Sequence, residues 1–272
     1  MATITPTLTS FGSAVPGNGV CVFFWDSDKE FYPGGIGGAL GYAPYTGDMT
    51  YTANESAAMN GIEGAYLGIG FDVKGEFSTT HDSKPGANIL GTANSTITSC
   101  PVSTITPNTI TTRGGELSSY KVISTTPDLS TYPLSGGLDE TYDNNNNRFA
   151  DSPPRTLHQS VTSAGDAIFT SVKIIMQNDG KRVRVEMKDP VTGKYYPYQI
   201  IDLDSGLGER PVPNTSPTKL RVGIGFSTSE SVMRCDIKNF SIYGTYSEPS
   251  KVGTFLKPRT APKHTRIITG TC

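Results

Sequence analysis

The chain has 272 residues and a formal net charge of −2 at pH 7, so its overall charge favours neither nucleic acid nor an anionic membrane as a partner. It is rich in Gly, Pro, Ser, Thr and Asn, which favours strands and turns over helices, and it is long enough for one large all-β domain or two small ones. No apolar run approaches the roughly 18–20 residues of a membrane-spanning helix, and the opening residues, MATITPTLTSFG, have neither the basic nor the apolar region of a signal peptide, so we expect no membrane insertion and no secretion signal.

Apolar or alternating stretches bounded by turn residues predict about ten to twelve strands and no convincing helix. GVCVFFWD (19–26) and GAYLGIGFDV (64–73) are continuous apolar runs, which predicts strands covered on both faces. Between them, FYPGGIGGALGYAP (31–44) is expected to form a glycine loop and a short strand. Further strands are expected at 108–114, 120–126, 194–204, 220–226 and 233–242, a hairpin at 167–189 around Asn178-Asp179-Gly180, and a long polar loop at 134–165. This succession predicts an antiparallel two-sheet sandwich.

The last two predicted strands are joined by a short polar loop, Ser-Thr-Ser-Glu-Ser at 227–231. The first of these strands contains Gly223 and Gly225, which leave room for another group to approach its backbone. One interpretation of the loop is a ligand-binding loop, and the other is a plain hairpin connection, because Ser and Thr are common in turns.

We expect residues 1–246 to form the sandwich domain. Residues 247–272 differ from them in composition. They contain five Lys or Arg residues, prolines and no acid after Glu248, which predicts an extended basic arm. Its β-branched run at 265–269 could add a strand to a neighbouring chain. We expect this arm to dock on identical subunits or other proteins of an assembly; the alternative is that it folds back on its own sheet.

Only about sixteen residues precede the strand at 19–26. Few strands can form in so short a segment, so one sheet is expected to be incomplete unless residues 3–15, the arm or a partner chain complete it. The cysteines Cys21 and Cys235 lie in apolar strands, where we expect buried, unreactive thiols, and no CxxC spacing favours zinc.

Five segments between about residues 17 and 245 form a characteristic ordered set: GNGVCVFFWD, GGIGGALGY, GAYLGIGFD, ITTRGGELSSYKVISTT and LRVGIGFSTSESVMRCDIKNFSI. This set resembles the legume-lectin-like (concanavalin A-like) jelly-roll family, and within it the microbial and viral (phage) branch. The resemblance implies an all-β fold, a concanavalin A-like two-sheet antiparallel jelly-roll sandwich.

The resemblance also implies a carbohydrate-binding site at one rim of the sandwich. Asn18 stands where the family has an Asp, and the loop glycines would offer backbone N–H groups. The implied sugar-binding residues are Asn18, Gly35, Gly37, Gly38, Ser227, Thr228 and Ser229. A turn at Asn18-Gly19 and a flexible glycine loop are the alternative interpretations.

A metal site is the least complete part of this resemblance. Asp72, Glu76 and Asp82 supply enough oxygen atoms for Ca²⁺. However, the family has a further acid two residues before Asp72, where this chain has Gly70. The alternative is that Asp72 only caps a turn at the end of its strand.

An enzymatic role is not expected. Glucanases that share this sandwich need two carboxylates about 5–10 Å apart, and no such pair is visible on one strand. Glu186 lies between Arg184 and Lys188 on its strand face, which predicts a solvated charged face. No histidine is part of a nucleophile motif.

Three functions are therefore compared. The first is a non-catalytic, lectin-like structural protein of a virion (a phage tail, fibre or capsid appendage) that also binds host surface glycans. The second is a free carbohydrate-binding module, which would reach the cell exterior by a non-classical route. The third, a glucanase-like hydrolase, is disfavoured by the absence of a carboxylate pair.

Overall fold

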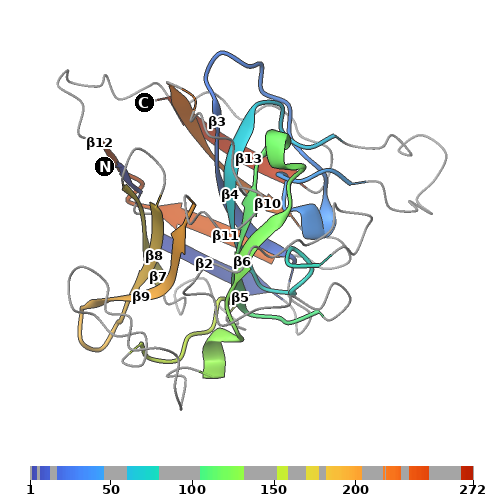
Figure 1. Ribbon diagram of the computed structural model, residues 1–272. Coiled ribbons are helices and arrows are strands. Elements are labelled where there is room, and N and C mark those ends of the chain that lie inside the picture. The colour runs from blue at the N-terminus through green and yellow to red at the C-terminus, as the bar shows by residue number, and fades with distance from the viewer. Residues whose placement is uncertain are drawn as a thin grey trace.

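Two β-sheets dominate the computed structural model of the chain (Figure 1). The residues that the structure describes are 2–4, 7–12, 17–45, 60–79, 105–131, 152–158, 170–177, 182–203, 217, 219–227, 233–244 and 265–271. Within these ranges the helical elements are three short 3₁₀ helices, η1 (Gly37–Ala39), η3 (Glu116–Ser118) and η4 (Leu129–Thr131), and no helix there is long and apolar enough to cross a membrane. The predicted all-β, two-sheet antiparallel sandwich is confirmed.

The front sheet has six strands, and each pairs antiparallel with its neighbours. Their order is β13 (Thr265–Thr271), β10 (Leu220–Ser227), β3 (Gly19–Asp26), β4 (Ala65–Asp72), β5 (Thr109–Gly114) and β6 (Val122–Thr125). The two continuous apolar runs of the sequence form β3 and β4 in its middle. Both are buried along almost their whole length, as predicted for strands that are covered on both faces.

The back sheet has seven strands. Five of them follow in the order β11 (Met233–Lys238), β2 (Thr7–Gly12), β7 (Thr170–Gln177), β1 (Ala2–Ile4) and β12 (Ile242–Gly244). In addition, β8 (Arg182–Lys188) pairs with β7, and β9 (Tyr195–Asp202) pairs with β8. The predicted hairpin at 167–189 is confirmed as β7 and β8, although its turn lies outside the described residues.

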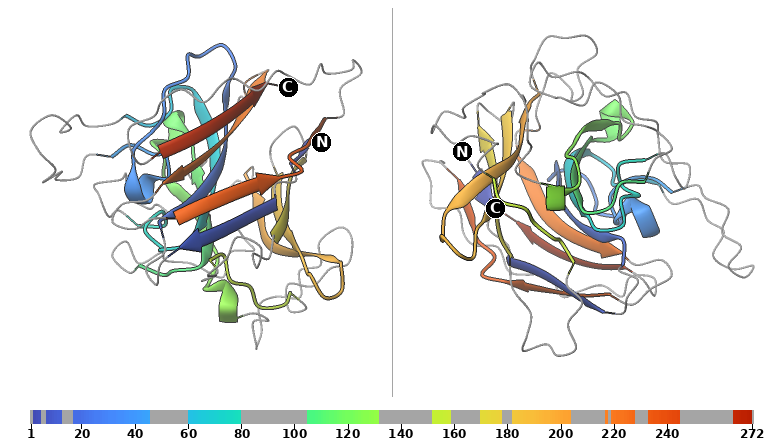
Figure 2. Two further views of the ribbon diagram at one scale, coloured as in Figure 1. Left: turned by 180° about the vertical axis from the view of Figure 1, so that it is seen from behind. Right: turned by 90° about the horizontal axis from the view of Figure 1, so that it is seen from below.

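The two strands expected at 220–242 do not form a hairpin. β10 pairs with β3 and β13 in the front sheet, whereas β11 pairs with β2 in the back sheet. Figure 2 shows β11 and β2 side by side, crossing the view beneath β10 and β13. β10 and β11 therefore belong to different sheets, and the hairpin interpretation is wrong.

The predicted gap in the back sheet is closed by the N-terminal residues. β1 pairs with β7 and β12, and β2 pairs with β7 and β11. The C-terminal strand β13 instead adds to the front sheet, where it pairs with β10 of the same chain over seven register positions. In this structure the arm thus follows the alternative in which it folds back on its own sheet.

The front sheet is buried on both faces by two separate hydrophobic cores. Its inner face packs on the back sheet through residues such as Val22, Ile69, Ile174 and Val185, all fully buried. Its outer face packs under a layer of loops that we call the loop layer, residues 31–45, 61–64, 76–79 and 116–121. This second core contains Cys21, Phe23, Trp25, Leu40, Tyr42, Ile62, Phe77 and Tyr120.

The glycines of the front-sheet strands make room for the loop layer. A Cβ atom at Gly68 would lie 2.6 Å from the Tyr42 ring, and one at Gly70 would lie 2.3 Å from the Phe77 ring. In β10, a Cβ at Gly225 would meet the backbone oxygen of Leu40 at 2.8 Å. The close approach that Gly223 and Gly225 predicted is therefore made by the protein's own aromatic rings and loop backbone.

The two predicted buried thiols differ in exposure. Cys21 is fully buried in the outer core, and this burial raises the pKa of its thiol well above the usual value. Cys235 is half-buried and packs against the inner core. The expectation of an unreactive thiol is thus best supported for Cys21.

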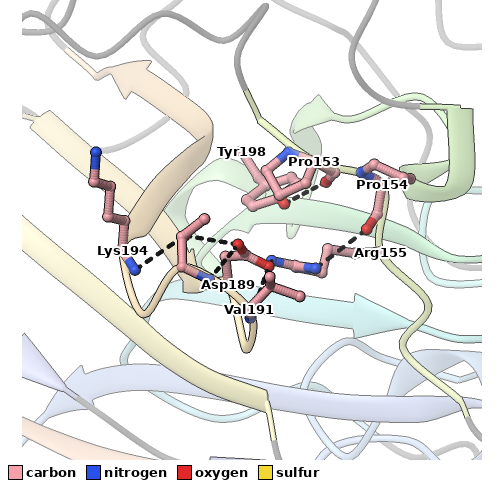
Figure 3. Close-up of polar contacts among 8 residues, drawn as sticks. Pro153, Pro154, Arg155, Asp189, Val191, Lys194 and Tyr198 are labelled. Atoms are coloured by element: carbon pink, nitrogen blue, oxygen red, sulfur yellow. Dashed lines mark hydrogen bonds and ion pairs between the residues drawn. The ribbon is translucent and has the colours of Figure 1, made fainter.

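A polar cluster ties the front sheet to the back sheet at one end of the sandwich. Asn108, just before β5, bonds the backbone oxygen of Arg155 through its Nδ2 at 2.8 Å. The guanidinium of Arg155 in turn donates to Asp189 at the end of β8 (2.9 Å). Nearby, Tyr198 Oη donates to the Pro153 carbonyl at 2.5 Å, and burial raises the pKa of Tyr198 to about 12, so the phenol stays a donor. Figure 3 shows the part of this cluster around Arg155, Asp189 and Tyr198. The cluster holds the described part of the predicted polar loop against the sandwich.

Candidate functional site

The predicted carbohydrate-binding rim lies where β3, β4 and β10 meet. Gly19, the first residue of β3, pairs with Asp72 of β4 on one side and with Ser227 of β10 on the other. Gly19 has φ of +143°, and a Cβ there would lie 2.3 Å from the backbone oxygen of Phe71. Only glycine fits this position, so the Asn18-Gly19 sequence is needed for the strands to meet.

Asn18 is fully buried at the centre of this rim. Its backbone N–H donates to the Ser227 carbonyl at 3.1 Å, and its own carbonyl accepts from Val73 N–H at 3.0 Å. Its side-chain Nδ2 donates to the carboxylate of Glu76. Asn18 therefore joins β10, the end of β4 and the turn after β4.

Two oxygen atoms of the rim have no hydrogen-bond partner among the residues that the structure describes. They are Asn18 Oδ1 and Ser227 Oγ, and both residues are fully buried. Their backbones are hydrogen-bonded to each other, so the two residues are neighbours in the rim. Buried polar atoms without partners are rare in native proteins, and these two suit a group that can both donate and accept, such as a hydroxyl.

Asp72 shapes the turn that follows β4. Its Oδ1 accepts from Gly75 N–H at 2.8 Å and its Oδ2 from Ser78 N–H at 3.2 Å. The turn needs Gly75, which has φ of +89°. Asp72 therefore caps this turn, as the alternative interpretation of the sequence predicted.

The acidic residues proposed for Ca²⁺ do not form a cation site within the described part of the chain. Glu76 is paired with the Lys74 ammonium at 2.8 Å and also accepts from the Asn18 amide. Both carboxylate oxygens of Asp72 face backbone N–H donors, and no group of three His, Cys, Asp or Glu is found in the described ranges. Asp82 lies outside them. The carboxylates of Asp72 and Glu76 are already engaged by N–H donors and an ammonium group, which disfavours a divalent cation at these two residues.

The glycine loop lies over β10 close to the rim. Leu40, which follows η1, approaches Gly225, two residues before Ser227. Within the loop, Gly34 N–H donates to Gly41 and Gly35 N–H donates to Ala43. The N–H of Gly35 is therefore engaged inside the loop and is not available to a sugar.

The two remaining loop glycines, Gly37 and Gly38, form η1 and are buried. Of the predicted sugar-binding residues, the structure thus brings Asn18 and Ser227 into contact and places the glycine loop beside them. Thr228 and Ser229 lie outside the described residues.

Arg113 is a residue of the site that the sequence analysis missed. This fully buried side chain of β5 donates three hydrogen bonds of 2.7 Å, to the carbonyls of Phe77, Thr79 and Tyr120. Its guanidinium also lies over the Phe77 ring, 5.2 Å from the centroid. Arg113 thereby holds the turn that carries Glu76 against the front sheet. An arginine within the otherwise uncharged TITTRG stretch was the available signal.

The predicted solvated face of β8 is wrong. Arg184 and Glu186 are both buried and form an ion pair, and only Lys188 is exposed. A long side chain on a strand can be covered by neighbouring segments, which the strand's own sequence does not reveal. Glu186 is held by Arg184, so the observed pairing disfavours a role as catalytic acid or base.

Comparisons with known proteins give structural matches alone. No family model matches the chain, and no curated protein matches it. Among solved structures, it is similar to lectin II from Ulex europaeus, with 12% identity and a TM-score of 0.43, and to the metal-free form of lectin I-B4 from Griffonia simplicifolia, with 13% identity and a TM-score of 0.39. Each match covers 89% of this chain and 72% of the other chain.

Proposed function

We propose that this protein is a non-catalytic carbohydrate-binding protein whose site is the rim around Asn18 and Ser227. The observation that carries the proposal is the presence of two buried, unpartnered oxygens, Asn18 Oδ1 and Ser227 Oγ, on residues whose backbones are hydrogen-bonded to each other. The ordered sequence motifs of the lectin-like family support it independently. The ion pairing of Glu186 and the turn-capping role of Asp72 argue against a hydrolase.

The geometry suggests how a sugar would be held. Sugar hydroxyls can donate to Asn18 Oδ1 and accept from Ser227 Oγ, because a hydroxyl is both donor and acceptor. Asn18 is neutral, so these bonds are weaker than bonds to the aspartate that stands here in the family. We expect a dissociation constant on the order of 1 mM per site, which several copies on one particle could strengthen by avidity.

A glycan screen followed by titration of the best sugar tests this function. Asn18→Ala and Ser227→Ala should each abolish or strongly weaken binding, and Ser229→Ala tests the adjoining loop. Val191→Ala is a suitable control, since Val191 is 90% exposed in a turn of the back sheet. Unchanged affinity in both Asn18→Ala and Ser227→Ala, with the fold intact by circular dichroism, would refute the rim assignment.

We further propose that the protein is a structural component of a virion, such as a phage tail, fibre or capsid appendage, and that its glycan site serves attachment to a host surface. The resemblance to the viral branch supports this proposal. A second support is β13, an edge strand on a long tether that could pair with β10 of an identical subunit or with another virion protein. Mass spectrometry of purified particles would test it, and absence of the chain from them would favour the free carbohydrate-binding module.

A further inference from the structure

A second polar pair lies at the other end of the front sheet, remote from the Asn18 rim. Trp25 of β3 and Arg221 of β10 are directly opposite each other in the antiparallel pairing. Asn18 and Ser227 lie at the start of β3 and the end of β10, so the two pairs are separated by most of the length of these strands.

Both side chains belong to the outer face of the sheet. Trp25 packs in the outer core with Phe23, whose ring centroid is 5.8 Å away. Arg221 alternates with Gly223 and Gly225, which face the loop layer. Facing residues on one side of an antiparallel pair have Cβ atoms about 4.5–5.5 Å apart, so the indole and the guanidinium start side by side.

Each of these side chains has a buried N–H group without an acceptor. Trp25 Nε1 and Arg221 Nε have no hydrogen-bond partner among the residues that the structure describes. Trp25 is 1% exposed, and Arg221 is half-buried. Two donors on facing residues, one of them cationic, require acceptor atoms that the described chain does not supply.

Two acidic side chains at this end of β3 are already engaged. Asp26 accepts from the backbone N–H of Asp28 at 2.9 Å, and Glu63 pairs with Lys29 at 3.0 Å. Neither accepts a hydrogen bond from Trp25 Nε1 or Arg221 Nε. Trp25 Nε1 and Arg221 Nε are thus left for an acceptor from outside the described residues.

We infer that Trp25 and Arg221 form a second site, which binds the carboxylate of an acidic sugar. The guanidinium can hold a carboxylate through two parallel hydrogen bonds, and the indole N–H supplies a third donor. Phe31 is half-buried against Trp25, with ring centroids 5.0 Å apart, and Tyr32 beside it is 55% exposed. These rings offer apolar surface to the carbon face of a pyranose. The sugar part of this inference rests on the proposed carbohydrate-binding function, whereas the anion part does not.

The chain contains a single tryptophan, so intrinsic fluorescence reports on this site directly. The probes are glucuronate, glucose and acetate at equal ionic strength. Glucuronate should change Trp25 fluorescence saturably, glucose should have no effect, and acetate should bind at least tenfold more weakly because it lacks the ring.

Matched variants localise the response. Arg221→Gln should abolish the glucuronate response, and Arg221→Lys should weaken it, because lysine keeps the charge but loses the bidentate geometry. Arg182→Gln, at a half-buried arginine of the back sheet, should respond like the unmodified chain. Thermal melts of each variant confirm that the fold is retained.

Several results would overturn this inference. An unchanged glucuronate titration in folded Arg221→Gln, or no response of the unmodified chain to glucuronate, would reject the site. An equal response to glucose or to acetate would reject an acidic sugar as ligand. Asn18→Ala should leave the glucuronate response intact, which separates failure of this site from failure of the rim.

Discussion

At the scale of single residues, Arg113 shows how a buried charge can organise a loop. Its three N–H bonds end on the carbonyls of Phe77, Thr79 and Tyr120, which belong to two different segments of the loop layer. Each of these carbonyls thereby has a donor inside the fold. The position of Glu76, and through it the orientation of the Asn18 amide, therefore depends on one side chain of the neighbouring strand.

Replacing Arg113 by methionine should destabilise the protein by about 3 kcal/mol or more. Methionine approximates the length of the arginine stem but donates nothing, and each unsatisfied buried group costs about 1–3 kcal/mol. Arg113→Lys should destabilise the protein less than Arg113→Met, because lysine can replace only some of the hydrogen bonds that the guanidinium donates. Urea denaturation provides the measurement, with Arg182→Met as the control. A loss below about 0.5 kcal/mol, the usual range for neutral surface changes, would contradict this role.

At the scale of elements, strand β10 and the glycine loop depend on each other through Gly225. A Cβ there would meet the Leu40 backbone oxygen at 2.8 Å and the Phe23 ring at 3.3 Å. The ring can shift, but the backbone oxygen can move only if the loop around η1 moves. We therefore expect this contact to set the height of the glycine loop above the rim.

Gly225→Ala should consequently lower the stability by about 1–3 kcal/mol, as is typical of overpacking, and should also weaken glycan binding. Chemical denaturation and sugar titration give the two readouts, and Val191→Ala serves as the control for both. If Gly225→Ala binds the sugar as tightly as the unmodified chain while losing stability, the loop position does not matter for the rim.

The turn between β8 and β9 makes a pH-dependent contribution to stability. Hydrogen bonds from Thr192 and Arg155 lower the pKa of Asp189 below its ordinary value. Because the pKa is lower in the folded state, the carboxylate stabilises the fold above its unfolded-state pKa of about 3.9. This contribution is lost as the pH falls from about 5 through the folded-state pKa.

Asp189→Asn should therefore lower the melting temperature at pH 7, and this difference should shrink steadily as the pH falls from about 5 toward 2. Melting curves across this range test the expectation. Asp28→Asn, at an exposed aspartate, should show little difference at pH 7. A difference for Asp189→Asn that stays constant down to pH 2 would rule out the carboxylate as its source.

At the scale of the whole molecule, the sequence predicted the positions of the strands better than it predicted which strands pair with each other. β3, β4 and the β7–β8 hairpin follow from local apolar runs and turn residues, and the structure contains all three. The placement of β10 and β11 in opposite sheets, and of β1 and β2 in the back sheet, depends on pairing between distant segments, which no local pattern encodes.

The candidate site shows the same division. Asn18 and Ser227 were singled out by their motifs and stay predicted binding residues, whereas the buried roles of Arg113 and Arg184 depend on segments that cover them in three dimensions. A strand's own periodicity indicates which face a residue joins but not what covers that face.

The proposed assembly would use β13, which forms one edge of the front sheet. Residues 245–264 precede β13, and a chain of this length can span at most about 65–70 Å. The seven register positions of β13 on β10 could therefore be filled by the arm of the same chain or, with identical pairing, by the arm of a second copy. We expect concentrated full-length protein to exchange these strands and to form assemblies.

Deleting residues 250–272 should lower the melting temperature, because β10 becomes an open edge, and should also abolish assembly. Light scattering over a range of concentrations and thermal melts give the two readouts. A synthetic peptide of residues 263–272 should bind the truncated chain and restore its melting temperature, whereas a scrambled peptide should not. An unchanged melting temperature after truncation would show that β13 does not stabilise its own sheet. Assemblies that persist without the arm would show that another surface joins the subunits.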